Sequence, residues 1–119
     1  MSDASLDAIR VAADMARVLI SPVSAWEVGL LARRARARLS FQPSPHDWFT
    51  DLLALPGMRL TPLNPRAAIA ASYLPGTLHR DPADRLLIAT ARDLGVPLVT
   101  RDRRILDYAA QGHVEAIAC

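Results

Sequence analysis

Acidic side chains gather at element boundaries between residues 79 and 102. Asp81 and Asp84 open an apolar helical pattern, and Asp102 follows a short apolar run. Hard divalent cations bind carboxylate oxygens, whereas a buried core has no use for such groups, because an unpaired buried carboxylate is costly. Asp81 and Asp84 by themselves could be helix caps, as the acids of a D-P-x-D sequence usually are. Together with Asp102 they favour a metal-dependent hydrolase.

The acids and one hydroxyl follow successive expected elements. Thr100 and Asp102 fall at the end of a strand, and ligand sites of open α/β sheets gather at the carboxyl ends of strands. Asp84 is the third residue of its helix, where free N–H groups and the helix dipole favour an ionised carboxylate. Glu27 lies on the apolar side of another helix. A solvated glutamate is commoner, but on this side Glu27 needs a partner, and a metal shared with Asp84 and Asp102 would supply one.

Length and composition indicate one globular domain over residues 1–119. Hydrophobic residues make up 51% of the 119-residue chain, which argues against disorder. No apolar run is long enough to span a membrane, and the N-terminus lacks the basic-then-apolar order of a signal peptide. The lone Cys119 leaves no internal disulfide to form. A cytoplasmic location is therefore expected.

All 14 basic residues are arginine, and the net charge is +2. The planar guanidinium pairs well with phosphates, so a polyanionic partner is allowed. A GC-rich genome would also produce arginine without lysine, and for any single arginine a solvated surface position is the commoner role. The candidates for phosphate contacts are Arg80, Arg85, Arg101, Arg103 and the cluster Arg33, Arg34, Arg36 and Arg38.

Helical and strand patterns alternate along the chain. Apolar runs predict strands over 18–20, 58–63, 96–100 and 114–118. Helical spacing predicts helices over 3–16, from 23 up to the arginine cluster at 33–38, and over 45–56, 65–73, 82–94 and 104–110. Ser44, Asn64 and Asp81 each stand before a proline, as helix caps do. Trp26 and Trp48 fit core positions. Strands separated by helices predict a short parallel sheet covered on both faces, a three-layer α/β/α fold.

Three segments together resemble the PIN-domain ribonucleases, and most of all the VapC-type toxins of toxin–antitoxin pairs. They read I-S-P-V-S-A-W-E, then L-H-R-D-P-A-D-R-L-L-I-A-T-A, then L-V-T-R-D-R-R-I-L-D-Y. The resemblance implies an endoribonuclease that depends on Mg²⁺ or Mn²⁺, cuts RNA, forms a homodimer and is silenced by an antitoxin protein. By position, the family's acids fall on Glu27, Asp84 and Asp102, its hydroxyl on Thr100 and an accessory acid on Asp81. RNA contacts are expected from Arg80, Arg85 and Arg101, and His79 could also touch substrate.

The chain departs from this family at its start. Relatives begin with an apolar strand that ends in the first acid of the metal site, whereas Met1 opens what resembles their first helix. That strand occupies the middle of the family's sheet, so its absence predicts a gap of about 9–10 Å between the strands at 18–20 and 97–100. The gap leaves two functions open. One is an active ribonuclease, in which metal-activated water attacks the phosphodiester. The other is a catalytically impaired binding module that keeps antitoxin or dimer contacts. A phosphatase is a distant third, because no phosphate-binding glycine loop is present.

Overall fold

A computed structural model describes residues 3–34 and 41–119 of the chain. Its contacts group into two compact units, where the sequence predicts one domain. Unit 1 comprises Met1–Arg10 and Leu63–Cys119, and unit 2 comprises Val11–Pro62. Helix α1, Asp3–Asp14, contributes residues to both units.

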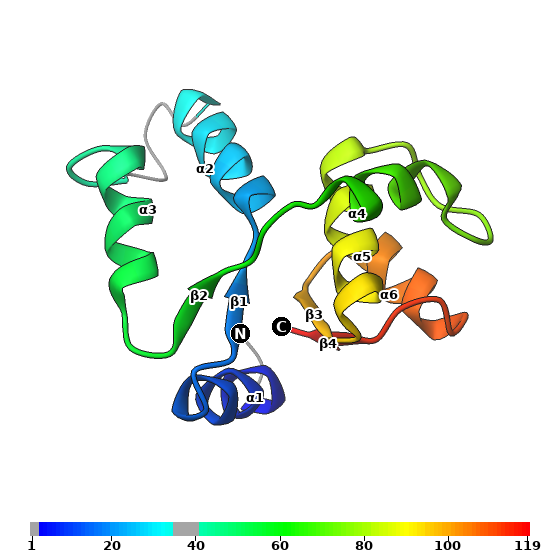
Figure 1. Cartoon of the computed structure of the whole chain (residues 1–119), viewed down its shortest axis with the longest axis horizontal. Helices are drawn as coiled ribbons and strands as arrows, with labels where there is room; N and C mark the ends of the chain where they lie inside the picture. Colours follow the sequence, from blue (N-terminus) through cyan, green and yellow to red (C-terminus); the bar gives the residue numbers. More distant parts are fainter. Residues whose placement is uncertain (1–2, 35–40) are drawn as a thin grey trace. The chain divides into compact units, whose positions relative to one another are not determined.

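The described residues of unit 2 include the end of α1, a two-stranded parallel sheet and helices α2 and α3. Strand β1 pairs with β2 so that Leu19 lies opposite Arg59, and Figure 1 shows the two strands side by side. Ser44 caps its helix as expected, because its hydroxyl accepts the N–H of Asp47 at 3.1 Å. Trp48 packs edge-on against Phe41. The elements are β1 Val18–Ile20, α2 Pro22–Arg34, α3 Pro45–Ala54 and β2 Met58–Leu60.

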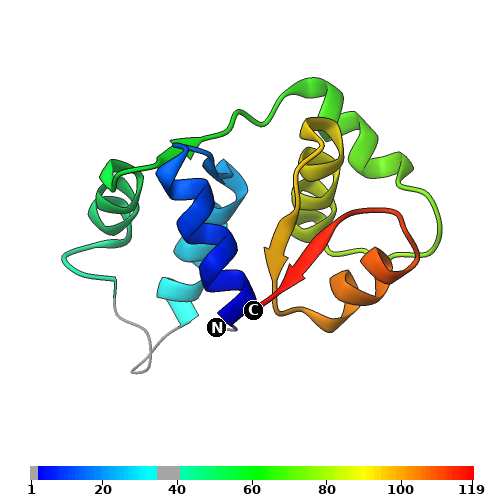
Figure 2. The ribbon, with the colours of Figure 1, turned by 90° about the horizontal axis from the view of Figure 1, so that it is seen from below.

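Unit 1 holds a second parallel pair of strands. Strand β3 pairs with β4 so that Leu98 lies opposite Ala116, and both strands are visible from below in Figure 2. Gly95 ends the longest helix of the unit at a φ of 65°, a left-handed conformation that glycine adopts without strain. The elements are α4 Pro65–Ala70, the short 3₁₀ helix η1 Ala71–Tyr73, α5 Pro82–Leu94, β3 Leu98–Thr100, α6 Arg103–Ala110 and β4 Ala116–Ala118.

The α/β fold class and the parallel strand pairing are confirmed. Over residues 3–34 and 41–119 the strands form two sheets of two, where the sequence predicts one sheet. The strands expected to flank a gap, β1 and β3, belong to different sheets. The core position expected for Trp26 is also wrong, because this residue is 51% exposed, and Trp48 is half-buried. No helix in the described part of the chain is both long and apolar enough to cross a membrane.

The core of unit 1 forms where one side of α5 meets α6. Ile88 is fully buried and Tyr108 is 1% exposed. On α5, Ile88 and Ala91 are three residues apart and therefore share a face. Burying this face holds the N-termini of α5 and α6 in place. The whole cluster is Ala71, Leu74, Ile88, Ala89, Ala91, Ile105, Tyr108 and Val114.

Tyr108→Phe is expected to lower the free energy of unfolding by about 1–2 kcal/mol, because the Tyr108 hydroxyl donates a hydrogen bond to the Pro75 carbonyl. Burial raises the pKa of Tyr108 above its ordinary value. The folded state therefore favours the neutral phenol. Its contribution to the free energy of unfolding is complete below about pH 10 and is lost as the pH rises through the raised pKa. Urea unfolding at about pH 7 and about pH 11 measures both effects. A phenylalanine variant with the same alkaline loss as the parent would contradict the assignment to Tyr108.

Candidate metal and RNA site

Asp81 is the N-cap of α5. Its Oδ1 accepts the N–H of Ala83 at 2.9 Å and that of Asp84 at 3.3 Å, with Pro82 at the first helical position. These bonds satisfy helix N–H groups that have no partner within the helix. The ordinary reading of Asp81, a helix cap, is thus confirmed, and its accessory metal role stays a prediction.

Asp84 lies in the first turn of α5, and its side chain is only 14% exposed. Its Oδ2 is 2.6 Å from His79 Nε2, at hydrogen-bond distance. The other ring nitrogen of His79, Nδ1, is buried and has no hydrogen-bond partner among the residues described. The imidazole is therefore held by the acid, and His79 is a direct neighbour of Asp84.

Asp102 is placed by two neighbours in the segment that joins β3 to α6. Its backbone N–H donates to Thr100 Oγ1 at 3.1 Å, and its Oδ1 accepts the N–H of Arg104 at 2.8 Å. Asp102 is therefore also an N-cap, a role that the sequence reading missed although an acid before a helix is a usual signal for it. The Arg104 side chain, by hydrogen bonding, holds the pKa of Asp102 below its ordinary value, and partial burial opposes this effect.

Arg104 joins the two acids. Its Nη2 is 3.3 Å from Asp102 Oδ2 and 3.9 Å from Asp84 Oδ2. Because both oxygens reach the same nitrogen, the two carboxylates lie together at the N-termini of α5 and α6. We call Asp84 and Asp102 the acidic pair. The sequence predicts this pair, but the arginine that binds both of its members was not anticipated.

Comparison with known proteins identifies the fold family. The PIN domain model matches residues 2–111. The chain belongs to the PIN-domain family. Ribonuclease VapC22 of Mycobacterium tuberculosis is 34% identical over 108 residues, which cover 91% of this chain and 78% of the relative. No solved structure gives a significant match. The family that the three sequence segments resemble is thereby confirmed.

Glu27, the third predicted acid of this PIN domain, is half-buried on α2 in unit 2. The acidic pair lies in unit 1, and the convergence of Glu27 with it stays a prediction. Within the described residues, no group of three His, Cys, Asp or Glu side chains has the arrangement of a metal site. The acidic pair still fits a cation. Carboxylate oxygens are ligands that hard cations prefer, and both acids already contact the positively charged guanidinium of Arg104.

Arg85 uses its side chain inside the PIN domain. Its Nε donates to the Ala71 carbonyl at 2.9 Å, and Nη1 donates to the carbonyls of Leu78 and His79 at 3.5 and 3.4 Å. The guanidinium therefore ties the loop that carries His79 to α5. This geometry favours a structural role for Arg85 over the predicted RNA contact.

The other predicted RNA contacts differ in where they lie. Arg80 is exposed just before α5, and Arg101 and Arg103 are exposed beside Asp102. Their phosphate contacts stay predictions. Arg33 and Arg34 are exposed at the end of α2, whereas Arg36 and Arg38 lie outside the described residues.

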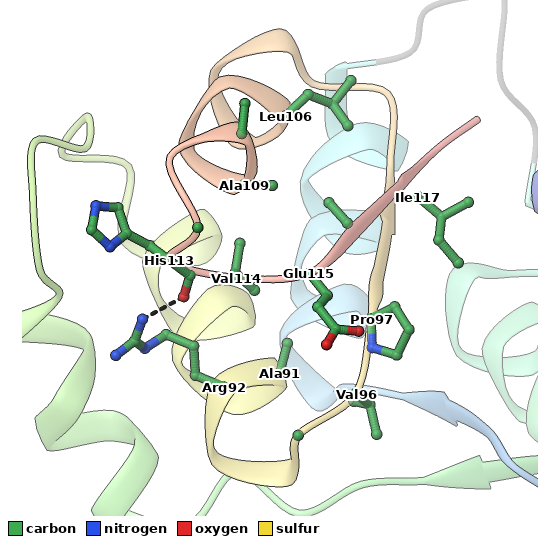
Figure 3. A pocket seen from close by; sticks show the side chains of 14 residues that line it. Ala91, Arg92, Val96, Pro97, Leu106, Ala109, His113, Val114, Glu115 and Ile117 are labelled. Carbon is green, nitrogen blue, oxygen red and sulfur yellow. Dashed lines mark hydrogen bonds between the residues drawn. The ribbon is translucent and has the colours of Figure 1, made fainter.

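A hollow of about 990 Å³ lies elsewhere in unit 1, among α5, α6 and the β3–β4 sheet. Figure 3 shows Val114 and Leu106 on its wall, with Arg92 donating to the His113 carbonyl beside it. Neither Asp84 nor Asp102 lines it. The chemistry expected from the sequence is therefore not located in this hollow.

Proposed function

We propose that this PIN domain is an endoribonuclease that depends on Mg²⁺ or Mn²⁺ and acts as the toxin of a toxin–antitoxin pair. The observation that carries the proposal is the acidic pair, Asp84 and Asp102, which holds a single cationic group at the ends of two helices. The relative whose name is Ribonuclease VapC22 supports RNA as the substrate.

The proposed reaction gives the acidic residues and their neighbours different roles. Asp84 and Asp102 would hold the metal, with Glu27 as a further ligand and Asp81 as an accessory acid. When bound, such an ion supplies an acidified water and stabilises charge on the phosphate. The Thr100 hydroxyl would orient Asp102, because it accepts the backbone N–H of Asp102. His79 would orient Asp84 through its ring nitrogen.

Positive charge around the acidic pair would bind the RNA backbone. Arg80 is exposed four residues before Asp84, and Arg101 is exposed directly before Asp102. Each phosphate contact would add affinity that falls as salt rises. Partner contacts with an antitoxin and a second copy of the chain would use exposed apolar side chains, because such residues gathered on a surface mark interaction sites. Exposed apolar side chains that such contacts would use are Leu31 on α2 in unit 2, and Ile69 on α4 and Tyr73 in η1 in unit 1. A cytoplasmic location is part of the same proposal.

Cleavage of a labelled single-stranded RNA by the purified chain tests the function. We expect cleavage with Mn²⁺, no cleavage after chelation with EDTA, and recovery when Mn²⁺ is added back in excess, because the water must be activated by a metal. Equal cleavage with and without EDTA would contradict the metal dependence. RNA binding without cleavage under any of these conditions would favour the alternative, an impaired binding module.

A further inference from the structure

Arg104 binds the acidic pair as a cation would. Its Nη2 lies within 4.0 Å of a carboxylate oxygen from each acid, at 3.3 Å from Asp102 and 3.9 Å from Asp84. The Arg104 side chain is 59% exposed, whereas those of Asp84 and Asp102 are 14% and 30% exposed. The acids are therefore held in place while the arginine reaches them from the solvent side.

We propose that the Arg104 guanidinium is a built-in counter-cation of the acidic pair, which a divalent metal ion has to displace. This inference rests on the proposed function, since it concerns the same acids. It assigns to Arg104 an inhibitory effect on metal binding, in contrast to the RNA contacts expected of the neighbouring arginines.

Charge explains why a divalent metal ion and the Arg104 guanidinium would exclude each other from the acidic pair. Two carboxylates that lie together repel each other, and a guanidinium between them offsets that repulsion when no metal is bound. A divalent ion held by Asp84 and Asp102 would lie near the guanidinium, because Arg104 Nη2 is already within 4.0 Å of an oxygen of each acid. The like charges then favour release of the arginine.

The contacts around Arg104 allow this release. The backbone N–H of Arg104, which bonds Asp102 Oδ1 at 2.8 Å, stays in place when the side chain moves. The start of α6 therefore does not depend on where the guanidinium lies. His79 remains on Asp84, at 2.6 Å, and keeps that carboxylate oriented.

Arg104→Gln tests the inference in the full chain, with Arg103→Gln as the matched control. Arg103 is the adjacent exposed arginine, so its replacement changes the net charge equally. Titration of Mn²⁺ followed by the spin-resonance signal of the free ion measures affinity without any activity. We expect Arg104→Gln to bind Mn²⁺ roughly two- to fivefold more tightly than the parent, the upper part of the range of one partly exposed ion pair. Arg103→Gln should stay within about twofold of the parent.

Thermal unfolding gives a second readout. In EDTA, Arg104→Gln should melt below Arg103→Gln, because its two carboxylates lose their counter-cation. Added Mn²⁺ should then raise its melting temperature more than that of the control, since tighter binding stabilises the folded state more. Arg104→Lys retains a positive charge and should bind Mn²⁺ with nearly the affinity of the parent.

The outcomes separate this inference from the proposed function. If the parent binds Mn²⁺ and Arg104→Gln binds it equally or more weakly, Arg104 is not a competitor, and the metal-dependent nuclease still stands. Equal tightening by Arg103→Gln would also overturn the inference, because net charge alone would then explain it. Absence of Mn²⁺ binding in the parent and in every variant would overturn the metal site itself and the inference with it.

Discussion

Asp84→Asn is expected to lower the rate of RNA cleavage by about 100-fold or more. Mutation of residues that only hydrogen-bond metal ligands typically costs about 10- to 100-fold, and loss of a ligand should cost at least as much. Asparagine keeps the shape of the side chain and the start of α5, but it removes the charge through which the acidic pair attracts a cation. Single-turnover cleavage with Mn²⁺ measures the loss, and circular dichroism with urea unfolding shows whether the fold is kept.

Asp107→Asn is the matched control for this experiment. Asp107 is exposed on α6, and the exchange removes the same charge by the same small change of atoms. We expect its cleavage rate to stay within about twofold of the parent, as for surface substitutions away from a site. If Asp84→Asn cleaves as fast as Asp107→Asn, the assignment of the acidic pair as the catalytic site is wrong.

Arg85→Met is expected to lower the free energy of unfolding by about 2–4 kcal/mol. The half-buried guanidinium donates to the backbone carbonyls of Ala71, Leu78 and His79, and methionine keeps most of the apolar stem but none of the donors. The carbonyls that lose their donors explain the size of the effect. Urea unfolding measures it.

Arg80→Met serves as the counterpart, because Arg80 is exposed and five residues away. It should leave stability unchanged within about 0.5 kcal/mol while it weakens RNA binding and reduces the salt dependence of that binding. If instead Arg85→Met is as stable as the parent and loses RNA affinity, Arg85 is the RNA contact that the sequence predicted.

Local sequence signals predict the elements well. The strand expected at 18–20 is β1, Val18–Ile20, and the helix expected from Pro82 to Gly95 is α5, Pro82–Leu94. Both are set by neighbours in the chain: an apolar run stopped by Ser21-Pro22 in one case, and an Asp81 cap with a closing glycine in the other. The position of the acids at element ends follows from the same signals.

Side-chain partners were harder to predict, because they depend on tertiary packing. Arg85 and Arg80 are equally plausible phosphate ligands in the sequence, and only the position of the loop that follows η1 separates their roles. Trp26 shares the helical spacing of Val23, yet Val23 is buried and Trp26 is half exposed. The shared use of Arg104 by two acids requires the N-termini of α5 and α6 to meet, which spacing along the chain does not reveal.

In the segment from β3 into α6, residues held by hydrogen bonds alternate with residues that are exposed. Thr100, Asp102 and Arg104 are linked through backbone N–H groups, while the alternate residues Arg101 and Arg103 face solvent. Mutation at the two exposed positions therefore leaves the orientation of the acid unchanged. Under the proposed ribonuclease function, exchange of these two arginines would alter the phosphate contacts with RNA and leave Asp102 in its place. During evolution such a segment would let the preferred RNA change while the acid that would hold the metal is kept.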